Sequence, residues 1–138
     1  MFQTGTLIVR PQSAKLTIST ELFGKMDPFV KLQIGANHFE TAVAHDQHKT
    51  PNWTDAFTFR INGEQTLQAT VLEKDNMSKH DLLGEATVQL GDVFQRRNVS
   101  NWFEIRKGGK VTGQLLLSFE FYPEGAGAQG GYGQPQQG

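Results

Sequence analysis

The 138-residue sequence contains no cysteine, no strong excess of either charge and no long hydrophobic run. Without cysteine, disulfides and thiolate metal sites are excluded, and a lack of disulfides fits a reducing compartment. Thirteen Lys and Arg against 14 Asp and Glu leave a formal net charge of −1, which is not the basic excess of a nucleic-acid-binding surface. No stretch approaches the roughly 20 apolar residues of a membrane span, and the N-terminus does not resemble a signal peptide. We therefore expect a cytoplasmic protein that does not bind nucleic acid.

The chain changes composition after Pro123. Residues 125–138 contain six Gly, four Gln and no charged residue. Such a segment buries too little apolar surface to offset the entropy lost on ordering. We expect one folded domain over residues 1–123 and a disordered, flexible Gly/Gln-rich tail over residues 124–138. The alternative for the tail is an interaction segment that uses Tyr132 and the glutamine side chains.

Short runs of alternating apolar and polar residues, separated by turn residues, fill the part before the tail. This pattern without helical periods of 10–15 residues between the runs is typical of an antiparallel β-sandwich. Asn62-Gly63 is a strong turn pair, Gly108-Gly109 fits a hairpin turn, and residues 91–98 fit one helical turn. We predict an all-β fold, an eight-stranded antiparallel β-sandwich with strands near residues 7–9, 29–34, 38–44, 57–61, 67–72, 82–90, 102–105 and 114–121.

Acidic residues bracket two of the predicted loops. Glu21 and Asp27 flank the first loop, whereas Glu73, Asp75 and Asp81 flank the loop between the fifth and sixth strands. If these loops are neighbours, five carboxylates converge, and such a cluster requires a cation or bound protons. A site of oxygen atoms without His or Cys suits calcium. The spacing also fits the alternative of solvated acidic loops.

Three segments, in order, resemble the motifs of C2 domains. Residues 24–31 (GKMDPFVK) resemble the GxxDPYV motif, and residues 73–85 (EKDNMSKHDLLGE) resemble the D-x-D-x-x-S-x-x-D-x-x-G-E loop. Between them, residues 49–59 (KTPNWTDAFTF) resemble the KT-x-NP-x-WNE-x-F-x-F segment, with Thr-Asp in place of Asn-Glu. The segments at 5–9 and 113–119 also fit the family. The resemblance therefore covers about residues 5–122 and implies a C2 fold of type II topology, as in short plant-like single C2 proteins.

The resemblance implies a set of calcium ligands. Asp27, Asp75 and Asp81 stand at aspartate positions of the family, and Ser78 matches a position that contributes an oxygen in some members. Glu21 and Glu73 stand where the family usually has Asp. The longer glutamate side chain enters a crowded site and adds a rotatable bond that binding must freeze. The charge is retained, so the resemblance implies Ca²⁺ as the cofactor.

Members of this family dock on anionic phospholipid membranes, and the resemblance implies the same for this chain. It places Leu22, Phe23 and Met77 among the membrane-inserting positions at the loop tips. The alternative is that Phe23 or Met77 folds inward to fill a gap. The lysine-rich strand by which many members hold phosphoinositides is missing, since residues 30–49 contain only Lys31 and Lys49.

No catalytic motif is present. Ser78, His80 and Asp81 lie within four residues of one loop and cannot build a nucleophile–base–orienter geometry. We therefore expect a protein that is not an enzyme. Our hypothesis is calcium-dependent, peripheral binding to anionic phospholipid membranes, as an adaptor or a membrane-trafficking accessory. The alternative is a calcium-independent scaffold that packs against protein partners with the sandwich and the tail.

Overall fold

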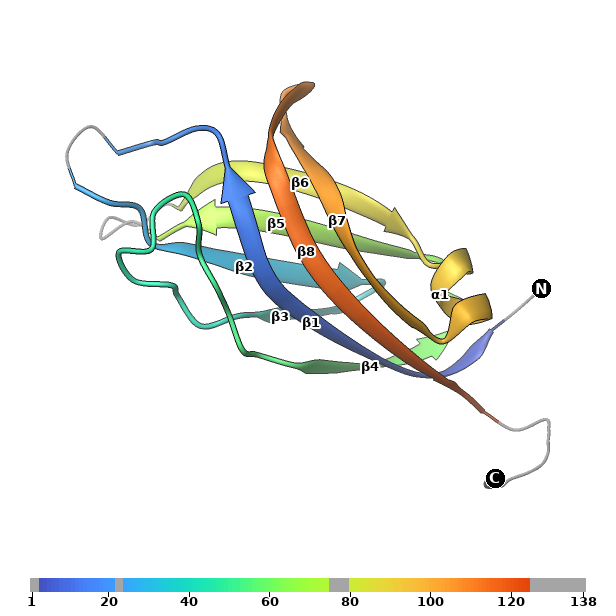
Figure 1. The fold of residues 1–138 in the computed structure, drawn as a ribbon. Coiled ribbons are helices and arrows are strands. Elements are labelled where there is room, and N and C mark those ends of the chain that lie inside the picture. The colour runs from blue at the N-terminus through green and yellow to red at the C-terminus, as the bar shows by residue number, and fades with distance from the viewer. Residues whose placement is uncertain (1–2, 22–23, 75–79, 125–138) are drawn as a thin grey trace.

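The computed structural model describes residues 3–21, 24–74 and 80–124, and these residues form an all-β fold. Within them lie eight strands and one short helix (Figure 1). The elements are β1 (Thr4–Leu16), β2 (Pro28–Ile34), β3 (Asn37–Glu40), β4 (Phe57–Asn62), β5 (Thr66–Glu73), β6 (Asp81–Gln89), α1 (Gly91–Arg96), β7 (Asn98–Lys107) and β8 (Lys110–Pro123). The predicted fold class, the eight strands and the helical turn are confirmed.

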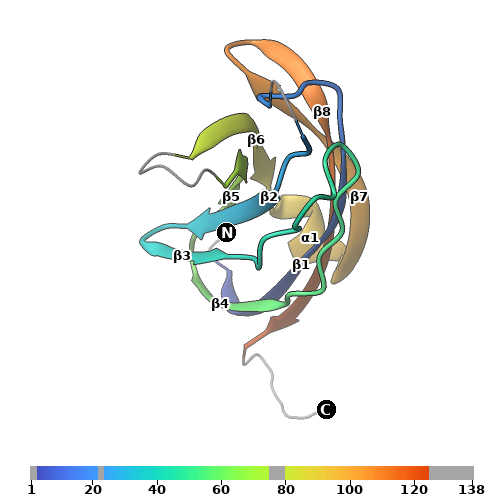
Figure 2. The same ribbon diagram turned by 90° about the vertical axis from the view of Figure 1, so that its left-hand side faces the viewer.

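The strands form two antiparallel layers. Their order is β3-β2-β5-β6-β7-β8-β1-β4, and β6 pairs with β7 only through Glu85 and Arg106. At this weak junction the sheet folds over, so that β3-β2-β5-β6 faces β7-β8-β1-β4 (Figure 2). The two outer strands β3 and β4 meet on the far side, where the rings of Phe39 and Phe57 stack with centroids 5.3 Å apart. The result is a sandwich that is nearly a barrel.

Alternating side chains of both layers fill the core. In β1, Leu7 and Val9 are fully buried, and their neighbours in sequence point outward. In β8, Leu117 and Phe119 lie in register beside β1 and are buried with them. Each such side chain contributes about 1.5–3 kcal/mol through removal of its apolar surface from water. Periodicity of two therefore explains which face of each strand points inward.

One predicted turn is present, and one predicted strand is shorter than expected. The turn at Asn62-Gly63 is present, with Gly63 at φ 95°, but it leads the chain from one layer to the other, since β4 pairs with β1 whereas β5 pairs with β2 and β6. The third strand was predicted to run to residue 44 and is wrong beyond Glu40. There the Thr41 N–H still donates to the Val30 carbonyl over 2.9 Å, but the Val30 N–H donates to the Thr41 hydroxyl over 2.9 Å and not to a main-chain carbonyl, so the regular ladder ends.

The loops that carry the predicted ligands lie at one end of the sandwich. The end of β1, the start of β2, the end of β5 and the start of β6 are at this end, and α1 is at the other (Figure 1). We refer to them as the loop end and the helix end. No helix among the described residues is long and apolar enough to cross a bilayer.

Candidate functional site

Strand register brings three of the predicted ligand positions to the loop end. Asp27 directly precedes β2, whose first residue Pro28 pairs with Glu73, the last residue of β5. Glu73 in turn pairs with Asp81, the first residue of β6. Directly opposed residues in an antiparallel pair have side chains on the same face, with Cβ atoms about 4.5–5.5 Å apart. Glu73 and Asp81 are therefore neighbours at the end of β5 and the start of β6, and Asp27 lies at the same end of the sheet, one residue before β2.

Glu73 is buried, with only 2% of its surface exposed. Both carboxylate oxygens accept hydrogen bonds: Oε1 from the Thr20 hydroxyl over 2.5 Å and Oε2 from the Asp27 backbone N–H over 3.3 Å. A buried carboxylate is costly unless such donors replace water. Glu73 thus ties the end of β5 to the loop that follows β1.

Asp27 is held from the other side by a turn over residues 45–48. Its Oδ1 accepts a 2.7 Å hydrogen bond from the backbone N–H of Asp46 and lies 4.0 Å from Nδ1 of His45. The Asp27 carbonyl accepts a hydrogen bond from Lys74 N over 3.0 Å. About a third of the Asp27 side chain stays exposed (31%), so the carboxylate is oriented but open to solvent.

Sequence reasoning missed the turn that orients Asp27. Asp46 and His48 adopt positive φ values of 59° and 56°, a left-handed conformation in which Asp and His are enriched several-fold among non-glycine residues. Nδ1 of His48 accepts a hydrogen bond from the Met26 N–H over 3.1 Å. The polar run HDQHK at residues 45–49, directly after the predicted third strand, was the available signal, but nothing in the local sequence ties it to Asp27, which lies 19 positions before Asp46.

The structure does not bring the remaining predicted ligands into contact with Asp27 and Glu73 among the described residues. Glu21 lies exposed in the β1–β2 loop, and its backbone N–H donates to the Ser19 hydroxyl over 3.1 Å. Asp75, Ser78 and the predicted membrane-inserting residues Leu22, Phe23 and Met77 lie outside the described residues. Among residues 3–21, 24–74 and 80–124, no three His, Asp or Glu side chains lie close enough to hold a metal ion. Asp27 and Glu73 are in contact, and convergence of all five carboxylates stays a prediction.

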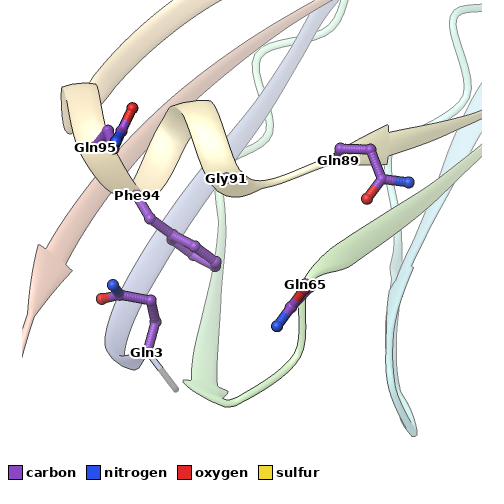
Figure 3. Close-up of a pocket in the computed structure, with 6 residues that line it drawn as sticks. All are labelled: Gln3, Gln65, Gln89, Gly91, Phe94 and Gln95. Atoms are coloured by element: carbon purple, nitrogen blue, oxygen red, sulfur yellow. The ribbon is translucent and has the colours of Figure 1, made fainter. Parts of the chain in front are cut away.

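The helix end carries a cavity of different chemistry. It has a volume of about 320 Å³ and is lined by four glutamines with Phe94 and Gly91 (Figure 3). The glutamines are Gln3, Gln65, Gln89 and Gln95. Amide groups donate and accept hydrogen bonds but do not titrate near neutral pH, so this lining offers neither acid–base chemistry nor a charge for an ion.

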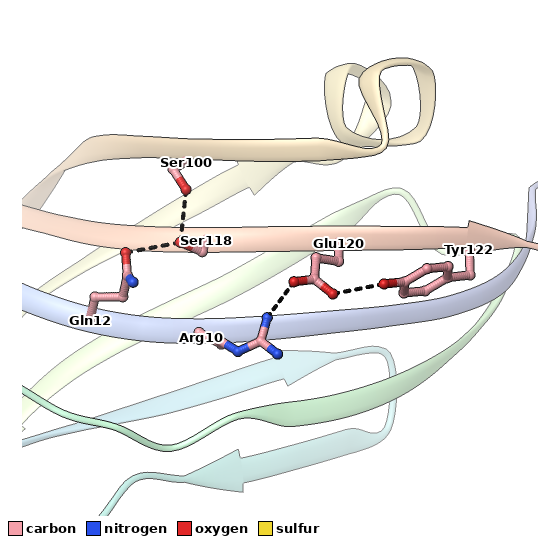
Figure 4. Close-up of polar contacts among 6 residues, drawn as sticks. All are labelled: Arg10, Gln12, Ser100, Ser118, Glu120 and Tyr122. Atoms are coloured by element: carbon pink, nitrogen blue, oxygen red, sulfur yellow. Dashed lines mark hydrogen bonds and ion pairs between the residues drawn. The ribbon is translucent and has the colours of Figure 1, made fainter.

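The outer face of β7, β8 and β1 carries a polar network (Figure 4). Arg10 forms a 2.8 Å ion pair with Glu120, whose other oxygen accepts a 2.9 Å hydrogen bond from the Tyr122 hydroxyl. The Tyr122 hydroxyl and, second, the Arg10 guanidinium lower the pKa of Glu120. Beside them, Ser118 bonds to Ser100 and donates to Gln12. These contacts link three strands across their exposed faces and include no base beside either serine.

Comparison with known proteins places these features in a family. A family model described as the C2 domain matches residues 5–105. Elicitor-responsive protein 1 of Oryza sativa subsp. japonica is 37% identical over 76 residues, 51% of this chain and 48% of the rice protein. The 16 kDa phloem protein 2 of Arabidopsis thaliana is 30% identical over 121 residues, 86% of this chain and 82% of the relative. The match thus spans about half of the first relative and most of the second.

Solved structures agree with this assignment. A C2 domain-containing protein from a putative elicitor-responsive gene has a TM-score of 0.79 at 29% identity, over 92% of this chain and 95% of the other. The tandem C2 domains of extended synaptotagmin 2, solved with calcium bound, have a TM-score of 0.75 at 22% identity, over 86% and 46% of the two chains. The second likeness concerns the fold alone.

Proposed function

The chain belongs to the C2 domain family, and we propose that it is a peripheral membrane-binding module that engages anionic phospholipids in a calcium-dependent manner, as an adaptor or a membrane-trafficking accessory. The loop end makes the contact. The observation that carries the proposal is the register Pro28–Glu73–Asp81, which makes Glu73 and Asp81 neighbours at the end of the sheet where Asp27 lies.

The proposed ligand set consists of oxygen donors from the two acidic loops. Ca²⁺ accepts six to eight oxygens in a flexible arrangement, and the exposed part of Asp27 suits that role. Glu73 fits less directly, since its side chain is buried and each of its oxygens already accepts a hydrogen bond, from Thr20 or from Asp27. We therefore assign the central role to the aspartates in the set Asp27, Asp75, Asp81, Glu21, Glu73 and Ser78.

The acidic loops explain why membrane binding would depend on calcium. With their carboxylates ionised, the loops repel the phosphate and carboxylate groups of anionic lipids. When bound, calcium neutralises this charge and offers coordination positions to lipid oxygens. Leu22, Phe23 and Met77 are the residues that we propose to enter the bilayer. Partial burial of three such side chains at ~1 kcal/mol each strengthens binding by a factor of ~100.

The proposal is tested by thermal unfolding in EDTA, in calcium and in magnesium. A ligand present at ~100 times its dissociation constant stabilises the folded state by ~2.7 kcal/mol, which corresponds to a rise in Tm on the order of 10 °C for a domain of this size. We expect a calcium-selective rise, together with calcium-dependent sedimentation with phosphatidylserine-containing vesicles. Asp75→Asn with Asp81→Asn should abolish both effects while the EDTA form stays folded. Absence of a calcium shift in the wild type would refute the calcium step.

A second candidate function is a calcium-independent scaffold that packs against protein partners. The observation in its favour is that the Glu73 carboxylate already has donors for both oxygens within the chain, so the loop end is held together without a metal ion. This candidate predicts the same Tm in EDTA and in calcium. It also predicts that the double aspartate variant binds vesicles and partners like the wild type.

A further inference from the structure

The hairpin between β7 and β8 ends in a cluster of positive charges, which we call the cationic tip: Arg106, Lys107 and Lys110. Lys107 and Lys110 pair directly across the two strands. Between them, Gly108 and Gly109 have φ values of 60° and 85°, a left-handed region that glycine adopts without steric cost. The turn is therefore as tight as a two-residue hairpin allows, and it presents two ammonium groups side by side.

The fold does not neutralise these two lysines. Like charges directly opposite each other destabilise an antiparallel pair, and both side chains are exposed. Arg106 is paired with Glu104 over 3.1 Å and donates to the Gly109 carbonyl over 3.1 Å, which braces the turn. In the part of the chain that the structure describes, no carboxylate lies within ion-pair distance of Lys107 or Lys110. The pair costs stability and receives no compensation inside the domain.

An apolar side chain accompanies the cations. Val111 is 37% exposed, one of three large hydrophobic residues so exposed among those described. It follows Lys110 directly and pairs across the hairpin with Arg106. A valine between two cations is suited to an interface in which charge and apolar surface meet within a few ångströms, as at the headgroup level of a bilayer.

The cationic tip lies near the β1–β2 loop. Thr17, just after β1, donates its N–H to the Thr112 carbonyl over 2.9 Å. The Thr112 hydroxyl donates to the carbonyl of Leu83 at the start of β6 over 2.7 Å. Both views show the hairpin projecting beyond the sandwich on the side where β1 leaves for the β1–β2 loop (Figures 1 and 2). A surface that meets the loop end can therefore also reach the hairpin.

We propose that the cationic tip is a second membrane contact, which holds anionic phospholipid headgroups through Lys107 and Lys110 and rests Val111 in the interface without any need for calcium. This inference rests on the proposed function, because it takes the loop end as the side that faces the membrane. Charge complementarity specifies the partner: the tip offers cations without internal partners, whereas the loops offer carboxylates.

A lipid surface fits this tip better than a nucleic acid does. Nucleic-acid affinity grows with the number of phosphates that a protein neutralises, and the tip supplies only two unpaired cations on a chain of net charge −1. The exposed Val111 side chain is apolar, so it forms no favourable contact with the charged phosphates of a nucleic acid. On an anionic bilayer, each lysine near the surface contributes about 1 kcal/mol, a factor of about five in affinity.

The test measures binding of the full chain to vesicles of phosphatidylcholine with or without phosphatidylserine, in EDTA and in calcium, at low salt. Lys107→Gln with Lys110→Gln should weaken binding to the anionic vesicles about 25-fold in EDTA. The matched control is Arg60→Gln with Arg96→Gln, which removes two positive charges from exposed ion pairs elsewhere and should change binding little. Val111→Thr keeps the charge of the tip. It should weaken binding to vesicles and leave binding to a soluble polyanion unchanged.

The outcomes separate this inference from the proposed function. If the hairpin variant binds like the control pair in EDTA and in calcium, the cationic tip is not a membrane contact, whereas calcium-dependent binding of the wild type would still stand. If the wild type binds anionic vesicles in EDTA, Lys107→Gln with Lys110→Gln abolishes this binding, and calcium does not strengthen it, then the cationic tip is supported as a membrane contact and calcium dependence is refuted. Equal loss on vesicles and on a single-stranded oligonucleotide, with no effect of Val111→Thr, would overturn the lipid assignment. A wild type that never binds anionic vesicles overturns both.

Discussion

The hydroxyl of Thr20 lies 2.5 Å from Oε1 of Glu73, and this hydrogen bond joins residues 53 positions apart in the chain. Because the carboxylate also accepts the Asp27 N–H, Glu73 fixes the last residue of β5 against both ends of the β1–β2 connection. Glu73, at a position where aspartate is usual in the family, thus has a structural role. An aspartate is shorter by one methylene, so its carboxylate would lie at different distances from the Thr20 hydroxyl and the Asp27 N–H.

Glu73→Gln should destabilise the domain. The amide has the size of the carboxylate but replaces one acceptor with a donor, so either the Thr20 hydroxyl or the Asp27 N–H faces a group that does not accept. A buried polar group left without its partner costs about 1–3 kcal/mol, and Glu73 is 2% exposed. Urea unfolding in EDTA measures this loss without any contribution from calcium.

Glu40→Gln is the matched control for that variant. Glu40 is exposed at the end of β3, and a surface substitution of this kind changes the free energy of unfolding by less than about 0.5 kcal/mol. Equal stability of Glu73→Gln and Glu40→Gln would contradict the role assigned to the two hydrogen bonds.

The strands and the approximate position of the acidic residues could be predicted from local patterns. Apolar and polar side chains alternate in residues 57–61 and predict β4, and Asn62-Gly63 and Gly108-Gly109 predict turns. Both signals depend only on residues that are neighbours in sequence. The inward orientation of Glu73 could not be predicted, since it depends on Thr20 from a distant loop. The same holds for Asp46, whose backbone N–H binds Asp27 across 19 positions. Contacts of this range follow from tertiary packing and leave no periodic signal.

Thr41→Val should destabilise the end of β3, whereas Thr41→Ser should not. The Thr41 hydroxyl accepts the Val30 N–H over 2.9 Å and donates to the Ala42 carbonyl over 2.9 Å. Valine has the same shape without the hydroxyl, so the buried Val30 N–H loses its acceptor at a cost of about 1–3 kcal/mol. Serine restores the oxygen. Denaturant unfolding of both variants, with amide hydrogen exchange at Val30, measures the effect, and faster exchange in Thr41→Ser than in Thr41→Val would contradict it.

Gly84→Ala should destabilise the contact between β6 and the β7–β8 hairpin. A Cβ at Gly84 would lie 2.5 Å from Oγ1 of Thr112 and 2.9 Å from Cδ1 of Ile105, and both residues are buried. Overpacking of this kind costs typically about 1–3 kcal/mol. Gly91 at the start of α1 has no atom within 4 Å of the corresponding position, so Gly91→Ala should leave stability unchanged or raise it by up to about 1 kcal/mol. Thermal unfolding of the two variants compares them, and equal effects would refute the packing argument.

Tyr122→Phe should raise the pKa of Glu120 toward its ordinary value. The Tyr122 hydroxyl is the first cause of the lowered pKa and the Arg10 guanidinium the second, so Arg10→Gln should also raise the pKa of Glu120. Because the folded-state pKa lies below the unfolded one, ionised Glu120 stabilises the fold at neutral pH, and this contribution is lost as the pH falls through the folded-state pKa. Carbon-13 NMR titration of the Glu120 carboxyl measures the shift. Glu124, whose pKa is lowered by Arg60, serves as the internal reference and should titrate as in the wild type. An unchanged Glu120 midpoint in Tyr122→Phe would mean that the hydroxyl does not act on this carboxylate in solution, and the lowered pKa would then have to come from Arg10 alone.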